Sequence, residues 1–282
     1  MEQSEKWIRI FEPSASHFAV NLRELWDYRD LMWLFVRRDF VTIYKQTVLG
    51  PFWVFLPPLL MTGVFTVVFG QVARIPTDGV PPFLFYLSGN VCWGYFSTSL
   101  THIAGSFAAN ASLYAKVFFP RLVIPISILI ATAFKFAAQF VLFLAVWTYY
   151  LAGGGPVQPT LGLLALPLLV IMMAVLSLGC GLIVMSVTVK YRDLQHLLGF
   201  GVQVWLYLTP IVYPLSQVPE PYRTLAAVNP MVLVAEAFRL GFFGTCGLTT
   251  SDVVVGTLVT VALCVLGVFA FSRTERTFVD SV

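Results

Sequence analysis

The sequence contains few charged residues. Asp, Glu, Lys and Arg make up 11% of its 282 residues, whereas hydrophobic residues make up 58%. Soluble globular domains carry roughly 25% charged residues, so this composition excludes that class. No charged residue occurs between Phe136 and Val189, where a Gly/Pro-rich segment at 153–159 interrupts the apolar sequence. Because a membrane-spanning helix needs about 20 apolar residues, this stretch predicts two spans joined by a tight turn.

The sequence also lacks the motifs of several enzyme classes. The dipeptide Gly-Lys does not occur, which excludes a phosphate-binding loop of the Walker A type. His17, His102 and His196 show no metal-binding spacing, and no Gly-x-Ser-x-Gly elbow is present. The four cysteines are scattered and are interpreted as packing residues. We therefore expect a chain that is not an enzyme and holds no metal or cofactor, so any energy for transport must come from a partner or an ion.

The hydropathy pattern predicts an all-α integral membrane protein with six spans. These spans are expected at about residues 49–72, 82–109, 122–151, 161–189, 194–214 and 253–272. Residues 1–48 are then an N-terminal cytoplasmic segment, 110–121 a short loop and 273–282 a cytoplasmic tail.

Positive charge is concentrated on one side of these spans. The N-terminal segment, the loops after the second and fourth spans, and the tail share most of the 17 Lys and Arg residues. The opposite side has only Arg74, Arg223 and Arg239. The positive-inside rule therefore predicts that both termini lie in the cytoplasm.

Residues 18–40 precede the first span and show helical periodicity. The apolar side chains that fall on one stripe are Leu22, Leu25, Trp26, Met32, Trp33, Val36 and Phe40. This pattern predicts an amphipathic helix in the cytoplasmic interface, with tryptophan and basic residues at headgroup level. The alternative is an ordinary cytosolic helix packed on the loops.

The segment at 215–250, between the fifth and sixth spans, is too long for a turn. Within it, Pro230–Phe243 is an apolar run of 14 residues, which is too short to cross the membrane. Prolines precede this run and glycines follow it. We expect a re-entrant pair of short outer helices, whose backbone must be buried in protein or face water. The alternative is an outer loop that rests on the membrane surface.

Lys135 is the one charge deep within a predicted span. It lies 14 residues past Arg121, or roughly 21 Å along a helix. A central position costs about 2.5–3.5 kcal/mol on insertion scales. Because Gln139 shares its helix face, we expect Lys135 and Gln139 to point into the protein, with Glu236 as a candidate counter-ion. Snorkelling of Lys135 to the outer surface is the alternative.

Acidic residues are absent from all six predicted spans, and no internal repeat is found. Both features argue against an ion-coupled carrier and favour a nucleotide-hydrolysing partner as the energy source. An integral-membrane transferase should show Asp, Glu or His clustered at one membrane face. Asp193 is the only acid in the predicted cytoplasmic loops between spans, which argues against that class.

Several motifs, in order along the chain, resemble those of the polysaccharide-exporting ABC transporter permeases. The motifs are Arg37-Arg38-Asp39 with residues 43–53, the loop at 110–121, Tyr-Arg-Asp-Leu at 191–194, Thr-Pro-Ile-Val-Tyr-Pro at 209–214, and Asn229-Pro230-Met231 with Glu236 and Arg239. These permeases belong to the type-2 ABC exporter family, which handles O-antigen, capsule and teichoic acid. The resemblance covers nearly the whole chain.

The resemblance implies a membrane subunit that exports a lipid-linked polysaccharide across the cytoplasmic membrane of a bacterium. Two copies of the chain would form the conduit, and two copies of a separate ATPase subunit would hold ATP and magnesium below it. The lipid carrier would be a polyprenyl diphosphate, and no nucleic acid would be involved. The alternatives are a type-2 exporter of a drug or a lipid, and an integral-membrane glycosyl- or acyltransferase.

The resemblance and the residue chemistry together assign two groups of residues near the membrane core and its inner edge. The residues for coupling to the ATPase, in a loop suited to a groove on a partner, are Asn110, Leu113, Lys116, Val117, Phe118, Pro120 and Arg121. The aromatic residues of the conduit, whose rings can stack on sugar C–H faces, are Phe52, Trp53, Phe55, Phe200, Trp205, Tyr207 and Tyr213. A plain basic loop and ordinary lipid-facing or packing aromatics remain the alternatives.

Two further groups lie at the two ends of the predicted path. The residues that would attract the lipid diphosphate are Arg37, Arg38, Tyr44 and Lys45, with membrane anchoring as the alternative. The residues of the outer gate are Tyr222, Pro230, Glu236 and Arg239.

Overall fold

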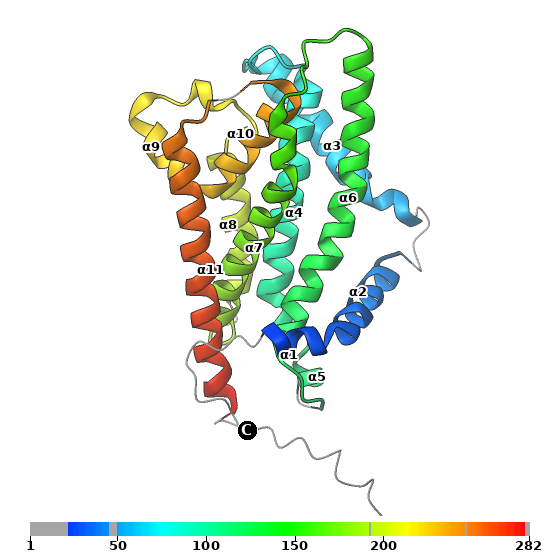
Figure 1. The fold of residues 1–282 in the computed structure, drawn as a ribbon, viewed down its shortest axis with the longest axis vertical. Coiled ribbons are helices and arrows are strands. Elements are labelled where there is room, and N and C mark those ends of the chain that lie inside the picture. The colour runs from blue at the N-terminus through cyan, green and yellow to red at the C-terminus, as the bar shows by residue number, and fades with distance from the viewer. Residues whose placement is uncertain (1–21, 45–49, 115, 192, 246, 280–282) are drawn as a thin grey trace, which may run out of the picture.

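The computed structural model describes residues 22–44, 50–114, 116–191, 193–245 and 247–279. Every regular element in these ranges is a helix, which confirms the all-α prediction. The long helices run along one axis, with α9 (Glu220–Val228) and α10 (Pro230–Phe243) at one end (Figure 1). The short helices α1 (Leu22–Asp27) and α5 (Ala111–Tyr114) lie at the other end.

Four segments within the described residues are long and apolar enough to cross a membrane. The first, Phe52–Val72, combines η1 (Gly50–Val54), α3 (Leu56–Phe65) and η2 (Thr66–Val72). The others are α6 (Val123–Ala152), η3 (Leu161–Ala165) with α7 (Leu166–Thr188), and α11 (Thr250–Val279) up to Thr274. A fifth is reached only if α9 and α10 are counted together as one bent span.

Helix α4 (Pro82–Ala109) coincides with the predicted second span but is not one of these four segments. Its 28 residues reach roughly 42 Å, so length is not the obstacle. The helix packs against α3, α6, α7, α8 and α10 and is buried over most of its length. An enclosed helix does not need an apolar surface toward lipid, which explains why α4 carries Ser88, Asn90 and Ser99.

Helix α8 (Leu194–Leu208) is shorter than the predicted fifth span, 194–214. Its 15 residues reach roughly 22 Å, less than the roughly 30 Å of hydrocarbon. The chain leaves the helix at Thr209, whose backbone is extended, and Pro210 follows. The structure therefore supports four or five spans by length and composition, with a bent helix pair before the last.

Buried hydrogen bonds join helices inside the bundle, and three of them, all between nitrogen or oxygen atoms, involve α4 or α6. They link Asn90 to Thr62 (3.0 Å), Ser99 to Thr132 (2.7 Å), and the Gln139 amide to the Val54 carbonyl oxygen (2.9 Å). The bonds connect α4 with α3, α4 with α6, and α6 with η1. Such bonds satisfy polar groups that could not reach water within a membrane.

Helices α7 and α11 approach each other closely at glycine. A Cβ atom on Gly179 would lie 2.7 Å from the Cα atom of Cys264, and a Cβ atom on Gly267 would overlap the Gly179 carbonyl group. Small residues let membrane helices pack backbone to backbone. This contact fixes the C-terminal helix against the bundle.

The N-terminal amphipathic stripe is divided between two environments. It forms α1 and α2 (Arg29–Tyr44), which are separated at Tyr28, and α2 packs against α6. Leu25 and Met32 are buried, whereas Trp26 and Trp33 are exposed. One edge of the stripe therefore packs on the bundle and the other is exposed. A position in the cytoplasmic interface stays a prediction.

Replacing Gly267 with alanine is expected to lower the apparent melting temperature of the purified chain in detergent. The added methyl group meets backbone, which cannot yield as a side chain can, and overpacking typically costs about 1–3 kcal/mol. The matched control is Gly199→Ala in α8, where nothing lies within 4 Å of an added Cβ atom. Equal melting temperatures for the two variants would contradict the close contact.

Candidate functional site

The end of the bundle that carries α9 and α10 contains the element predicted to be re-entrant. Helices α9 and α10 are bent by 98° relative to each other, which confirms a bent helix pair between spans. The Asn229 side chain caps α10 by accepting a hydrogen bond from the Met231 amide (3.1 Å), and Pro230 occupies the first turn. Gly244, at φ 73°, ends α10 in the left-handed conformation.

Asn229 also joins the bent pair to α8. Its Oδ1 atom accepts from the Trp205 indole N–H (3.1 Å), and its amide donates to the Thr209 hydroxyl (2.9 Å). The Asn229 side chain thus connects the break between α9 and α10 to the end of α8. The sequence showed a helix start at Asn229-Pro230 but gave no sign of the bond to Trp205.

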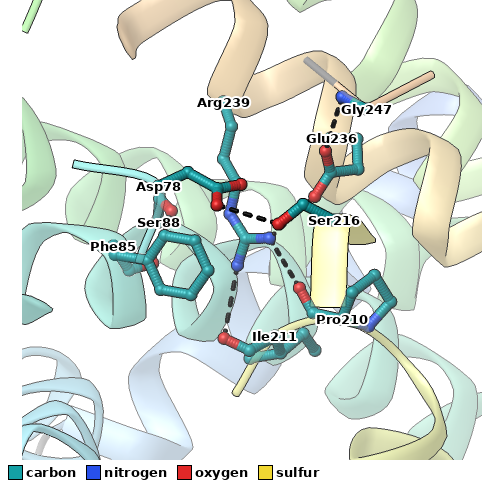
Figure 2. Close-up of polar contacts among 9 residues, drawn as sticks. All are labelled: Asp78, Phe85, Ser88, Pro210, Ile211, Ser216, Glu236, Arg239 and Gly247. Carbon is teal, nitrogen blue, oxygen red and sulfur yellow. Dashed lines mark hydrogen bonds and ion pairs between the residues drawn. The ribbon is translucent and has the colours of Figure 1, made fainter. Parts of the chain in front are cut away.

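Arg239 is buried at the same end of the bundle, with 2% of its surface exposed (Figure 2). One terminal nitrogen donates to the Pro210 carbonyl oxygen (2.6 Å) and to Glu236 (2.9 Å). The other donates to the Ile211 carbonyl oxygen (3.2 Å). The guanidinium carbon lies 3.7 Å from the ring centroid of Phe85, so the cation also faces the aromatic ring.

Glu236 completes this network. Its Oε1 atom accepts from Arg239, and its Oε2 atom accepts from the Gly247 amide (3.2 Å), as Figure 2 shows. Nearby, the Ser216 hydroxyl donates to Asp78 (2.8 Å) across the surface of the same end. One buried ion pair therefore binds α10 to α4, to the segment after α8 and to the segment before α11.

The four predicted gate residues do not form one cluster. Glu236 and Arg239 are paired, and Pro230 is buried at the start of α10. Tyr222 lies on α9 and is exposed. The structure thus brings two of the four into direct contact.

Lys135 is not paired with Glu236, so the expected counter-ion is wrong. Both carboxylate oxygens of Glu236 are used by Arg239 and Gly247. Helical periodicity in the sequence predicts which face of its helix Lys135 occupies. It does not predict how far along the bundle axis Glu236 lies from Lys135. Lys135 instead lines a cavity with Asp39 and His102, while Gln139 holds η1 through the Val54 carbonyl oxygen.

The opposite end contains the predicted coupling loop. Phe118 has 77% of its surface exposed and Val117 has 50%, whereas the next residue, Phe119, is buried. The Phe119 ring stacks on Tyr114 (centroids 5.5 Å apart) and lies 5.9 Å from Phe35 of α2. The loop therefore presents apolar side chains outward and is attached to the interface helix inward.

A polar contact strengthens this attachment. Arg38 of α2 donates to the Asn110 side chain at 3.4 Å and forms an ion pair with Asp39 at 2.8 Å. The other predicted coupling residues lie around the same loop: Lys116 is exposed, and Leu113, Pro120 and Arg121 are half-buried.

The predicted diphosphate-binding residues are described only in part. Arg37 is exposed on α2 beside Arg38. Lys45 lies outside the described residues, and of Tyr44 the structure describes only the backbone at the end of α2.

The predicted conduit aromatics separate into exposed and packed residues. Phe52 and Phe200 are the most exposed of the seven, at 72% and 71%, and about half of the surface of Trp53 and Tyr207 is exposed. Phe55 is half-buried, with its ring centroid 6.4 Å from that of Phe52.

The remaining two make specific contacts within the chain. Trp205 packs edge to face against Trp93 (6.2 Å) and Phe96 (5.0 Å) of α4. The Tyr213 hydroxyl donates to the Tyr207 carbonyl oxygen (3.2 Å). These contacts hold the end of α8 in place.

No group of three or more His, Cys, Asp or Glu side chains that could hold a metal ion is found in the described part of the chain. The polar chemistry of the bundle is instead that of ion pairs, caps and interhelical hydrogen bonds.

Comparison with known proteins identifies relatives of this chain. Residues 30–243 match the ABC-2 type transporter family. The chain is similar to the O-antigen export system permease protein RfbA of Myxococcus xanthus, with 31% identity over 79% of this chain and 84% of the relative. It is also similar to RfbA of Klebsiella pneumoniae (28% identity, 74% and 79%) and to the capsule polysaccharide export inner-membrane protein CtrC of Neisseria meningitidis serogroup A (24% identity, 85% and 89%).

Replacing Arg239 with methionine is expected to destabilise the purified chain by about 3–5 kcal/mol, because a buried carboxylate loses its partner. The control is Arg223→Met, which breaks the exposed pair with Glu220 at the same i, i+3 spacing and should cost about 1 kcal/mol or less. Thermal unfolding in detergent measures both. The double variant Glu236→Gln/Arg239→Met should recover part of the loss, since it leaves no buried charge. A loss no larger than that of Arg223→Met would refute the structural role of the pair.

Proposed function

This chain belongs to the ABC-2 type transporter family, and we propose that it is the membrane subunit of an exporter for a lipid-linked, O-antigen-like polysaccharide. The observation that carries the proposal is the similarity to O-antigen export permeases over about four fifths of both chains. The polymer would move outward across the cytoplasmic membrane of a bacterium. ATP hydrolysis in a separate subunit, which would bind ATP and magnesium, would supply the energy.

We propose six spans, with α4 as the second and α8 as the fifth. The central position of α4 removes the need for an apolar outer surface, and the segment after α8 has its carbonyl groups paired with Arg239. Both termini would lie in the cytoplasm, as the distribution of basic residues indicates. The outer end would then carry the bent helix pair and the inner end the loop at 110–121.

Two copies of the chain would enclose the conduit. Exposed apolar side chains on one chain support this proposal, because α8 and η1 display Phe52, Leu197, Phe200 and Leu208. A second copy related by twofold symmetry would bring two such faces together. Neutral aromatic rings at this face would hold each sugar weakly, so that no single step traps the polymer.

Two copies of the ATPase subunit would bind the loop at 110–121. Val117 and Phe118 would insert into a groove on that subunit, in the usual helix-in-groove manner. Because Phe119 packs on Phe35, a displacement of the loop would reach α2 directly and α6 through α2. Arg37 and Arg38, with Tyr44 and Lys45, would attract the carrier diphosphate beside this element.

Replacing Phe118 with alanine is expected to weaken binding of the ATPase subunit roughly thirtyfold, which corresponds to about 2 kcal/mol for an aromatic anchor. Co-purification at limiting concentration, followed by titration, measures the affinity. The matched control is Leu258→Ala, which shortens another exposed apolar side chain on α11. Equal losses for the two variants would show that Phe118 does not contact the subunit.

Transport itself is tested with the complete complex in lipid vesicles. A polyprenyl-diphosphate-linked polysaccharide should raise the rate of ATP hydrolysis, and the polymer should become accessible to a lectin on the side opposite the ATPase. Stimulation by drugs or phospholipids, without stimulation by the polymer, would instead favour the other exporter class. Failure to bind any ATPase subunit would overturn the proposal as a whole.

A further inference from the structure

A cavity of about 160 Å³, lined by five polar and five apolar residues, lies away from the ion pair of Glu236 and Arg239. It is formed by four elements: α2, η1, α4 and α6. The polar side chains that line it belong to Asp39, Thr98, His102, Thr132 and Lys135. A cavity of this size has room for a small polar group and several waters, but not for a sugar polymer.

The charge of Lys135 is not balanced by a partner of its own in this cavity. Lys135 forms no hydrogen bond or ion pair among the described residues. The one carboxylate in the lining, Asp39, is already held by Arg38, whose two nitrogens lie 2.9 and 2.8 Å from the same oxygen. A lysine within a membrane helix normally pairs with another group, because an isolated charge there is costly. Lys135 therefore has no counter-ion of its own, since the Asp39 carboxylate that shares the lining is bound by Arg38.

The remaining polar groups suit such an anion. The hydroxyl group of Thr98 and the imidazole of His102 form no hydrogen bond within the described chain, and each can donate one. Thr132 differs, since its hydroxyl bonds Ser99 and the Ile128 carbonyl oxygen. One cation and two available donors around a small space match the oxygens of a phosphate group.

The position of the cavity indicates how such a group would reach it. Asp39 and Phe40 place it at the level of α2, the interface helix (Figure 1). Helix α6 reaches about 45 Å from its 30 residues, which exceeds the hydrocarbon thickness by about 15 Å. Lys135 lies 12 residues, or roughly 18 Å, past the start of α6, so it lies near the inner boundary of the membrane when this extra length extends into the cytoplasm. Phe40 and Trp53 are exposed at the edge of the cavity. Aromatic residues of this kind favour the headgroup region.

We propose that this cavity binds the phosphate group of a lipid in the cytoplasmic leaflet, with Lys135 as its counter-ion. The bound lipid would tie α2 to α4 and α6 at the base of the bundle. The same chemistry could be supplied by a phospholipid, by a polyprenyl diphosphate or by free phosphate. The proposal concerns binding by this chain alone and does not depend on the exported cargo.

Native mass spectrometry of the purified full chain in detergent tests this site. The matched probes are phosphatidic acid and diacylglycerol, which differ only in the phosphate group. We expect retention of phosphatidic acid but not of diacylglycerol. Lys135→Met should weaken retention at least tenfold, Lys135→Arg should keep it, and Lys190→Met should leave it unchanged because Lys190 lies outside the cavity. Equal retention by wild type and Lys135→Met would overturn the proposal.

A second variant covers the case in which Lys135→Met does not fold. Thr98→Val retains the charge of Lys135 and should still weaken the binding of phosphatidic acid several-fold; an unchanged affinity would count against the site.

Competition then identifies the source of the phosphate. Displacement by polyprenyl diphosphate indicates a site shared with the carrier, and displacement by inorganic phosphate indicates a free-anion site. Resistance to both indicates a phospholipid site.

Discussion

Within hydrocarbon no water is available to pair with a polar group, so each interruption of a helix must find its partners inside the protein. The chain leaves helix at two neighbouring places, after α8 and between α9 and α10. At the first place, Arg239 donates hydrogen bonds to the carbonyl oxygens of Pro210 and Ile211. At the second place, the Asn229 side chain forms hydrogen bonds with Trp205 and Thr209, which lie at the end of α8. Arg239 satisfies carbonyl groups of the segment after α8, and Asn229 caps α10 and joins it to α8, so these two side chains stabilise the bent pair at this end.

This constraint also explains the unusual composition of α4. The helix touches α3, α6, α7, α8 and α10, and it supplies Phe85 beneath the Arg239 guanidinium group. Its polar residues bond to α3 and α6. Helix α4 contacts both the Arg239 network and the cavity beside α2. It is therefore suited to hold the two ends of the bundle in a fixed relative position. The mobile parts of a transport cycle would then be the elements that pack on it from outside.

Some of this arrangement could be predicted from the sequence, and some could not. Helix α4 coincides with the expected segment 82–109, and the bend before α10 was predicted correctly, because Pro82 and Pro230 mark helix starts in the sequence itself. The assignment of Glu236 to Lys135 failed because periodicity gives a helix face but not a height relative to another helix. The anchoring of Trp205 by Asn229 was missed for a related reason: the bond crosses two helix breaks, whose geometry no local pattern specifies. Phe35, which ties α2 to the loop, lay off the stripe that was identified.

Charged and uncharged side chains would have different roles within the bundle: uncharged rings would contact the polymer, and charged groups would stabilise the structure. A polymer that slides must be held weakly at every step, and aromatic contacts of about 0.5–1.5 kcal/mol meet that need better than ion pairs. The most exposed predicted conduit residues, Phe52 and Phe200, are uncharged, whereas Arg239 is buried and hydrogen-bonded through both terminal nitrogens. Lys135 is the exception, and it lies in a small cavity beside the interface helix. A fixed phosphate there would neutralise Lys135, so that this half-buried cation would not arrest a passing diphosphate, and the cavity and the neutral aromatic face would serve the same requirement.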